Sequence, residues 1–305
     1  FIKMSFVFNV NDVGNISGLR SSEDSDVPFL TPIFFDIKVL IKYFYDLDYK
    51  CEFHSETYGT IYCPSNNDEE FDSIFSFGIN PNGKVIAWYG DLIELDPKEI
   101  LYLKSHNIES DGNIESEFYK AQIGAEFTDS IKEVELILLK TKISTLTNEL
   151  FGFQLYKTIE QSVPEIIAMC SQYKRIVFNS EDDMKIIYST WNEDLIEDLN
   201  VIELKKNLTS EKTGKDSLKG LKGLKLLELF IKNTLNINEN IVAPLFYLYD
   251  LRLWADHKNA DKYYKDVVLK MEMKENESYK EIYEVLIDKI VGLFEKLIQS
   301  SLEIK

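Results

Sequence analysis

The sequence predicts an α+β protein, in which a mixed α/β domain precedes an all-helical antiparallel bundle. The first part of the chain contains short segments rich in aromatic and β-branched residues, which is typical of strands. From about residue 181 onward, apolar residues recur at spacings of three and four, which is typical of amphipathic helices. Charge also divides the chain: residues 1–200 carry 16 Lys and Arg against 35 Asp and Glu, whereas residues 201–305 carry 18 against 17. We therefore expect two domains, at residues 1–178 and 179–305.

Composition indicates a globular protein without a membrane span. The 305 residues are enough for two cores, and 45% of them are hydrophobic. The longest apolar stretch, residues 33–45, is interrupted by charged side chains, and no secretory signal is evident at the start. Three cysteines (Cys51, Cys63 and Cys170) form no dense framework, which favours reduced thiols. We expect the protein in the bacterial cytoplasm.

The strongest local prediction in the first domain is a β-hairpin. Two β-rich segments, residues 71–79 and 84–89, flank Asn80-Pro-Asn-Gly83, whose Asn-Gly pair tolerates the positive φ angles of a tight turn. The other elements expected in this half are a strand at 6–10, a helix from Pro32 to 45, strands within 49–63, a helix at 97–105, a strand or helix at 118–127 and a helix at 131–150.

The second domain shows helical patterns only. Asn240 is suited to cap the helix that runs through Trp254. Residues 205–216 are rich in Lys, Ser, Thr and Asn, which predicts a flexible connection. The expected helices span residues 182–204, 218–235, 240 to about 259, 260–271 and 278–304. Five helices with short connections fit an antiparallel bundle.

The segment Arg252-Leu-Trp-Ala-Asp-His257 places a guanidinium and an imidazole near the end of an apolar helix, with four residues between them. Imidazole can accept and donate protons near neutral pH. Guanidinium can hold a phosphate and the charge that develops on it. Asp256 and Asp250 are placed to orient His257 or to pair with Arg252. The pair is therefore a candidate phosphate-transfer site.

The surrounding sequence, Ala243-Pro-Leu-Phe-Tyr-Leu-Tyr-Asp-Leu-Arg252-Leu-Trp-Ala-Asp-His257, resembles the R-x4-H region of HEPN domains. Trp88-Tyr-Gly-Asp-Leu and Tyr102-Leu-Lys-Ser-His106 in the first half, with Glu117-Phe-Tyr-Lys, resemble stretches of uncharacterised bacterial proteins that end in a similar helical segment. Active HEPN ribonucleases often carry a polar residue directly after the arginine, where this chain has Leu253.

This resemblance implies a metal-independent endoribonuclease, used as an antiviral defence or toxin effector, that needs no cofactor. His257 would exchange protons with the ribose 2′-OH and the leaving oxygen. Arg252 would stabilise the charge on phosphorus, and Asp256 would support both residues. The resemblance also implies a homodimer through the helical bundle. Under this hypothesis, the acidic first domain senses a trigger or regulates the nuclease.

A second function is open on the same residues. Arg252 and Asp256 are spaced to form a plain i,i+4 bridge on a helix surface, and His257 is placed to cap the helix end. The bundle would then serve interaction or dimerisation without catalysis. The acidic first half would bind a protein partner, since its charge repels RNA.

Lysines in the second domain predict where RNA would bind. Counterion release from lysines drives binding to nucleic acid, and the alternative is an ordinary solvated helix face. The candidate RNA-binding residues are Lys205, Lys206, Lys219, Lys222, Lys225 and Lys258.

Other motifs are weaker. Cys51-x2-His54 with Cys63 supplies only three zinc-type ligands, so a buried thiol is the simpler interpretation, and we assign no metal. Glu203-x-Lys205 matches the last motif of some metal-dependent nucleases but lies in a helical, lysine-rich segment. The sequence has no Gly-x4-Gly-Lys-Ser/Thr, which excludes a standard P-loop ATPase.

Overall fold

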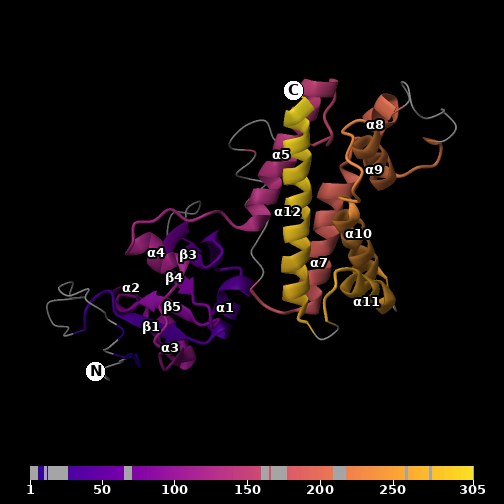
Figure 1. Ribbon diagram of the computed structural model, residues 1–305. Coiled ribbons are helices and arrows are strands. Elements are labelled where there is room, and N and C mark those ends of the chain that lie inside the picture. Colours follow the sequence, from indigo (N-terminus) through magenta and orange to yellow (C-terminus); the bar gives the residue numbers. More distant parts are fainter. Residues whose placement is uncertain are drawn as a thin grey trace. The chain divides into compact units, whose positions relative to one another are not determined.

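Figure 1 shows the computed structural model, which describes residues 6–9, 12, 27–64, 71–158, 165, 177–208, 218–257, 260–274 and 277–304. The α+β class is confirmed, with a sheet in the first half and many helices. The chain divides into two compact units, Phe1–Ile131 and Lys132–Lys305. This division differs from the expected one at residue 178, because the helix α5 (Lys132–Phe151) packs along the last helix of the chain.

An antiparallel six-stranded sheet forms the first unit, in the order β2-β3-β4-β5-β1-β6. The predicted hairpin is confirmed between β4 and β5. Gly83 has φ +73°, and its N–H donates to Asn80 O at 2.8 Å, while Asn80 N–H donates to Lys84 O at 2.9 Å. The strands are β1 (Pro32–Phe35), β2 (Lys50–Ser55), β3 (Tyr58–Pro64), β4 (Phe71–Ile79), β5 (Val85–Trp88) and β6 (Asn107–Ile108).

The helix expected from Pro32 onward was wrong in its first turn, because Pro32–Phe35 is the strand β1. All four residues are buried, and β1 lies between β5 and β6. When every residue of a short segment is apolar and buried, the sequence shows neither the alternation of a strand nor the spacing of a helix. The two structures therefore cannot be distinguished from such a segment. The chain becomes helical only at the 3-10 turn η2 (Ile37–Val39) and the helix α1 (Leu40–Tyr45).

Helices cover both faces of the sheet. Phe75 and Gly78 of β4 point to opposite faces because side chains alternate along a strand. Phe75 contacts Tyr43 of α1, and a Cβ on Gly78 would lie 2.8 Å from Phe118 Cβ in α4. The remaining helices of this unit are α2 (Tyr89–Ile93), α3 (Pro97–His106) and α4 (Glu117–Gln122), so the strand or helix expected at 118–127 begins as a helix.

The expected strand at residues 6–10 was wrong over its described part, since residues 6–9 form no regular strand. Val7 instead pairs with a side chain at the edge of the sheet. Its N–H donates to Asn107 Oδ1 at 2.6 Å, and Asn107 Nδ2 donates to Val7 O at 3.2 Å. The Asn107 amide thus replaces the backbone of a neighbouring strand, and Phe6 packs edge-on against Phe35.

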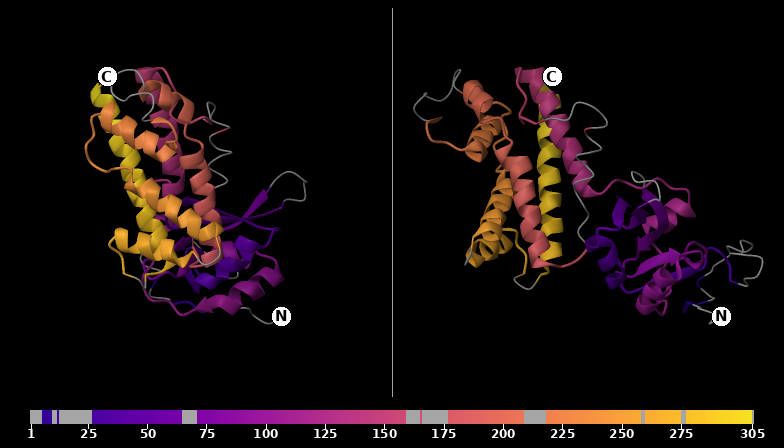
Figure 2. Two further views of the ribbon diagram at one scale, coloured as in Figure 1. Left: turned by 90° about the vertical axis from the view of Figure 1, so that its right-hand side faces the viewer. Right: turned by 180° about the vertical axis from the view of Figure 1, so that it is seen from behind.

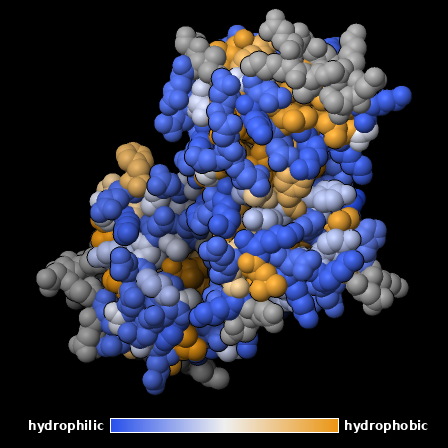
Figure 3. Space-filling model, turned by 45° about the vertical axis from the view of Figure 1, so that its right-hand side comes forward, coloured by the Kyte–Doolittle hydropathy of each residue, from blue (hydrophilic) through white to orange (hydrophobic). Residues whose placement is uncertain are grey.

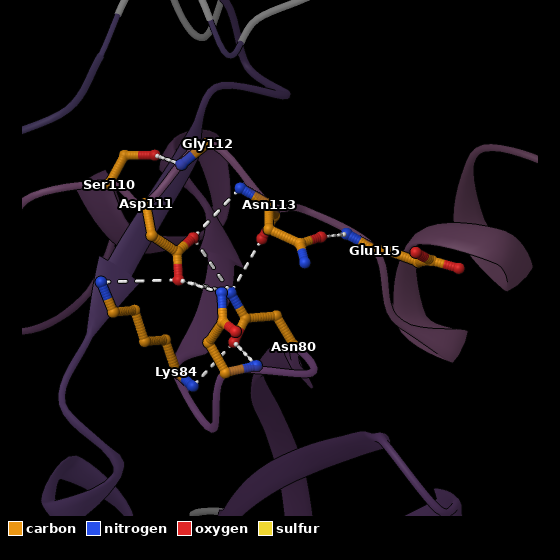
Figure 4. Close-up of polar contacts among 8 residues, drawn as sticks. Asn80, Lys84, Ser110, Asp111, Gly112, Asn113 and Glu115 are labelled. Atoms are coloured by element: carbon orange, nitrogen blue, oxygen red, sulfur yellow. Dashed lines mark hydrogen bonds and ion pairs between the residues drawn. The ribbon is translucent and has the colours of Figure 1, made fainter.

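A polar cluster fastens the β4–β5 hairpin to the loop before α4 (Figure 4). Asp111 is its centre: its carboxylate accepts hydrogen bonds from Asn80 Nδ2, Asn82 Nδ2 and Asn113 N–H, and it lies 3.5 Å from Lys84 Nζ. These donors lower the pKa of Asp111 against the opposing effect of its burial, which is the largest single influence. The cluster satisfies its own polar groups, which indicates a structural role.

The regular elements of the second unit are all helices among its described residues, and one isolated β-bridge joins Tyr156 to Leu199. Figures 1 and 2 show α5, α7, α10 and α12 side by side. Glu181 of α7 contacts Tyr279 of α12, and Trp191 contacts Tyr283, so these two helices run parallel. The expected antiparallel arrangement therefore holds for α7 and α10 but not for α7 and α12. The helices are α7 (Glu181–Asn192), α8 (Val201–Leu208), α9 (Gly223–Asn233), α10 (Ala243–Asp256), α11 (Asp261–Lys270) and α12 (Tyr279–Ile304).

The continuous helix expected at residues 182–204 was wrong. After α7 comes a π-helical turn, η3 (Glu193–Glu197), in which Asp198 N–H donates to Glu193 O at 3.0 Å. α8 then begins at Val201. Spacings of three and four recur through such a turn, so the pattern alone does not reveal the interruption.

A buried chain of hydrogen bonds ties α5, α7 and α12 together. Trp191 Nε1 donates to Tyr283 Oη at 3.2 Å, and Tyr283 Oη donates to Glu133 Oε1 at 2.9 Å. Glu133 is 3% exposed, and its Oε2 has no hydrogen-bond partner among the described residues. Burial raises the pKa of Glu133, although the Tyr283 hydrogen bond opposes the shift.

The distribution of hydrophilic and apolar residues on the surface is that of a globular protein. Figure 3 shows a face on which hydrophilic residues predominate and apolar residues form separate patches. In the part of the chain that the structure describes, no helix has the length and apolar character needed to cross a membrane.

Candidate functional site

Arg252 and Asp256 lie one turn apart on the last two turns of α10. Arg252 Nε and Asp256 Oδ2 form an ion pair at 2.7 Å, as the i,i+4 spacing allows. Both side chains are partly open to solvent, with exposed fractions of 31% and 34%. The contact uses Nε alone, and the terminal nitrogens of the guanidinium have no hydrogen bond among the described residues. The guanidinium is therefore held closely at its Nε edge, and Nη2 has only a longer contact with Glu197.

Two residues that sequence reasoning missed complete this arrangement. Ser189 Oγ of α7 donates to Asp256 Oδ1 at 3.0 Å. Glu197 Oε1, from the π-helical turn, lies 3.9 Å from Arg252 Nη2 and accepts from the buried Asn192 Nδ2 at 2.8 Å. Both come from more than 50 residues earlier in the chain, and no spacing rule links them to α10.

His257 ends α10. Its backbone N–H donates to Leu253 O at 3.2 Å, and its φ and ψ of −118° and 131° are extended, so the helix stops there. The side chain is exposed. His257 therefore lies at the same helix end as the Arg252–Asp256 pair, in reach of solvent. The N-cap of α10 is Val242 rather than the expected Asn240.

Asp250 takes no part in this pair. Its Oδ2 contacts Lys270 Nζ of α11 at 3.3 Å, so the sequence-based pairing with Arg252 is replaced by a contact between α10 and α11. The other carboxylates nearby, Asp256 and Glu197, make the surroundings of Arg252 acidic.

The candidate RNA-binding lysines fall into two groups. Lys206 is 2.5 Å from Glu203, and Lys225 is 2.7 Å from Glu228 and lies over the ring of Phe246. Lys205, Lys219 and Lys222 have no ion pair among the described residues, and the last two are exposed just before α9. Lys258 lies outside the described residues. Lys219 and Lys222 are thus the members most available to a phosphate.

Residues of the weaker motifs make ordinary contacts within the fold. His54 Nε2 is 2.9 Å from Thr60 Oγ1, and burial lowers the His54 pKa. Cys51 is buried, and Cys63 is partly exposed. Among the described residues, no group of three His, Cys, Asp or Glu side chains is placed to hold a metal ion. Glu203 pairs with Lys206, not with Lys205.

Comparison with known proteins adds no assignment: no protein-family model, curated protein or solved structure matches this chain.

Proposed function

We propose that the second unit is a metal-independent endoribonuclease of HEPN type that acts as a homodimer, with a defence or toxin role under control of the acidic first unit. The observation that carries the proposal is the fixed guanidinium of Arg252. Asp256 pairs with its Nε, Ser189 donates to Asp256, and His257 is exposed at the same helix end. In the proposal, a phosphate displaces the longer contact of Nη2 with Glu197 and binds the terminal N–H groups. Charge-assisted donors that are already oriented stabilise a developing anion most strongly.

In this proposal, His257 removes the proton of the ribose 2′-OH and returns a proton to the leaving 5′-oxygen. The 2′-oxygen attacks phosphorus, the bond to the 5′-oxygen breaks, and a 2′,3′-cyclic phosphate forms. Arg252 holds the negative charge that builds up on the non-bridging oxygens. Asp256 is a positioning residue, since it touches Arg252 and not the reacting atoms.

The test is cleavage of labelled RNA by the full chain in the presence of EDTA. His257→Ala should lower the rate by about 10²–10⁴-fold and Arg252→Ala by about 10²–10³-fold, because they remove the proton carrier and the charge-stabilising group. Circular dichroism should stay unchanged in both variants. An activity that needs a divalent metal and survives His257→Ala would refute the site.

A second function is favoured by the acidic surroundings of Arg252. Asp256 and Glu197 already balance its charge and join α10 to η3, as a structural bridge would. Under this alternative the bundle is a non-catalytic interaction module, and the first unit binds a protein partner. It predicts no cleavage by the wild type, and a change of stability or dimerisation in Arg252→Ala.

A further inference from the structure

The first unit contains a cage of tyrosine rings around the ammonium group of Lys42. The Nζ atom lies 4.3 Å from the ring centre of Tyr49, 5.0 Å from that of Tyr102 and 5.4 Å from that of Tyr43. The rings come from α1, from the loop after it and from α3. Aromatic faces arranged in this way attract alkylammonium ions through their negative π-faces.

A buried carboxylate completes the cage. Glu99 is 7% exposed, and its Oε2 accepts from Lys42 Nζ at 2.6 Å and from Tyr49 Oη at 3.0 Å. Its Oε1 accepts from Tyr43 Oη. Burial alone would lower the pKa of Lys42, but the hydrogen bonds to Glu99 and Tyr49 raise it above its ordinary value. The cage thus combines the two features that recognise a charged amine, rings and a carboxylate.

The cage is open to solvent on one side. Lys42 keeps 23% of its side chain exposed, so an occupant can reach the ammonium position from the surface. An opening around a single ammonium group suits a ligand that presents one primary amine.

The charge of this unit favours a cationic partner. Residues 1–131 contain 9 Lys and Arg against 23 Asp and Glu, a net charge of −14 out of −18 for the chain. Such a field attracts basic segments and repels nucleic acid. We propose that the cage is a docking site for a lysine side chain of a basic protein segment, and that Lys42 occupies it as an internal substitute until the partner's lysine displaces it.

Removal of the internal occupant tests the cage. Lys42→Ala in the full chain removes a group equivalent to n-propylammonium. We expect n-propylammonium chloride to raise the thermal midpoint of Lys42→Ala more than that of the wild type. Sodium chloride at equal ionic strength, and 1-propanol, which has the same chain length without the charge, should not do so. Lys98→Ala is the matched control, since it removes the same charge from an exposed position on α3 outside the cage. Equal responses of the two variants would overturn the proposal.

Binding of a lysine-containing peptide tests whether the ligand of the cage is a protein segment. A fluorescent peptide with one lysine between leucines should bind Lys42→Ala about tenfold more tightly than the wild type, a factor within the range of a desolvated cation–π contact. Replacing the peptide lysine by norleucine should abolish binding. Rescue by the free amine without any binding of the peptide would overturn the assignment to a protein partner.

The wild type supplies a readout that does not depend on the folding of a variant. Reductive ¹³C-methylation labels every lysine, and the Lys42 signal, assigned with Lys42→Arg, should be shifted upfield by the three rings. Saturating peptide should move this signal to the position of exposed lysines. A signal that remains in place under saturating peptide would show that Lys42 is a permanent part of the fold, and would overturn displacement.

Discussion

Asp256 holds one edge of the Arg252 guanidinium, with its Oδ2 2.7 Å from Nε, while Nη2 faces Glu197 Oε1 at the longer distance of 3.9 Å. An exposed i,i+4 pair contributes only about 0.3–0.5 kcal/mol to stability. The contact therefore matters more for the direction of the guanidinium than for the free energy of unfolding.

We accordingly predict that Asp256→Ala changes stability by less than about 1 kcal/mol but lowers RNA cleavage about 10- to 100-fold, because a misplaced catalytic group loses rate steeply. Single-turnover cleavage and thermal unfolding would measure both effects. Asp250→Ala is the control, as it removes a carboxylate from the same helix that contacts Lys270 instead. Similar losses of rate in both variants would exclude a positioning role for Asp256.

RNA affinity should depend on the lysines that lack a carboxylate partner. Replacing Lys219 and Lys222 by Gln should reduce the slope of log K against log salt by about 0.7 for each phosphate of single-stranded RNA that is then no longer neutralised. Replacing Lys206 and Lys225, which pair with Glu203 and Glu228, should change it less. Filter binding at several salt concentrations would compare the two double variants, and a larger effect of the second would contradict the prediction.

Stability should fall as pH rises through the raised pKa of Glu133. Its folded-state pKa lies above the ordinary 4.5, chiefly through burial, with a smaller contribution from Glu284 and opposition from Lys132. The folded protein therefore holds this proton to higher pH than the unfolded chain does. The stabilisation is complete below the ordinary value and is lost as the pH passes through the raised one.

Glu133→Gln should remove this component of the pH dependence, because the amide does not titrate. Urea unfolding at a series of pH values above 4.5 would measure it. Glu135→Gln on the same helix should retain the wild-type dependence. If Glu133→Gln kept it as well, Glu133 would not be its source.

The compact second unit should need α5 to fold. Leu136, Ile137 and Ile143 of α5 are buried, and each buried side chain of this size contributes about 1.5–3 kcal/mol. We predict that residues 132–305 unfold cooperatively, whereas residues 178–305 bind a hydrophobic dye and lose the sharp transition. Calorimetry of both fragments would decide, and a sharp transition for the shorter one would restore the boundary at residue 178.

Local patterns predicted much of the fold. The hairpin at Asn80 to Gly83 was predictable because the turn requires a positive φ, and α5 was predictable from its helical spacing. β1 was not, because Pro32–Phe35 is buried on all sides and shows no period. The unit boundary was missed since the packing of α5 on α12 is a contact between distant parts of the chain.

One part of the candidate site could be predicted from local sequence, and the other part could not. The Arg252–Asp256 pair follows from helical spacing, so the sequence was enough to expect it. Ser189 and Glu197 reach that pair only because α7 and α10 run antiparallel, which depends on tertiary packing. The cage around Lys42 was equally hidden, since Glu99 is 57 residues away in sequence.

The π-helical turn at Glu193–Glu197 lies between α7 and α8 and constrains how many residues this connection contains. A turn closed by a bond from residue i to i+5 contains one residue more than an α-helical turn. Deleting a single residue there would let the turn close from i to i+4 as in an ordinary α-helix, and would remove the widened turn from which Glu197 reaches Arg252. Substitutions in this turn would leave the number of residues between α7 and α8 unchanged. The segment is thus predicted to accept changes of side chain far more readily than changes of length.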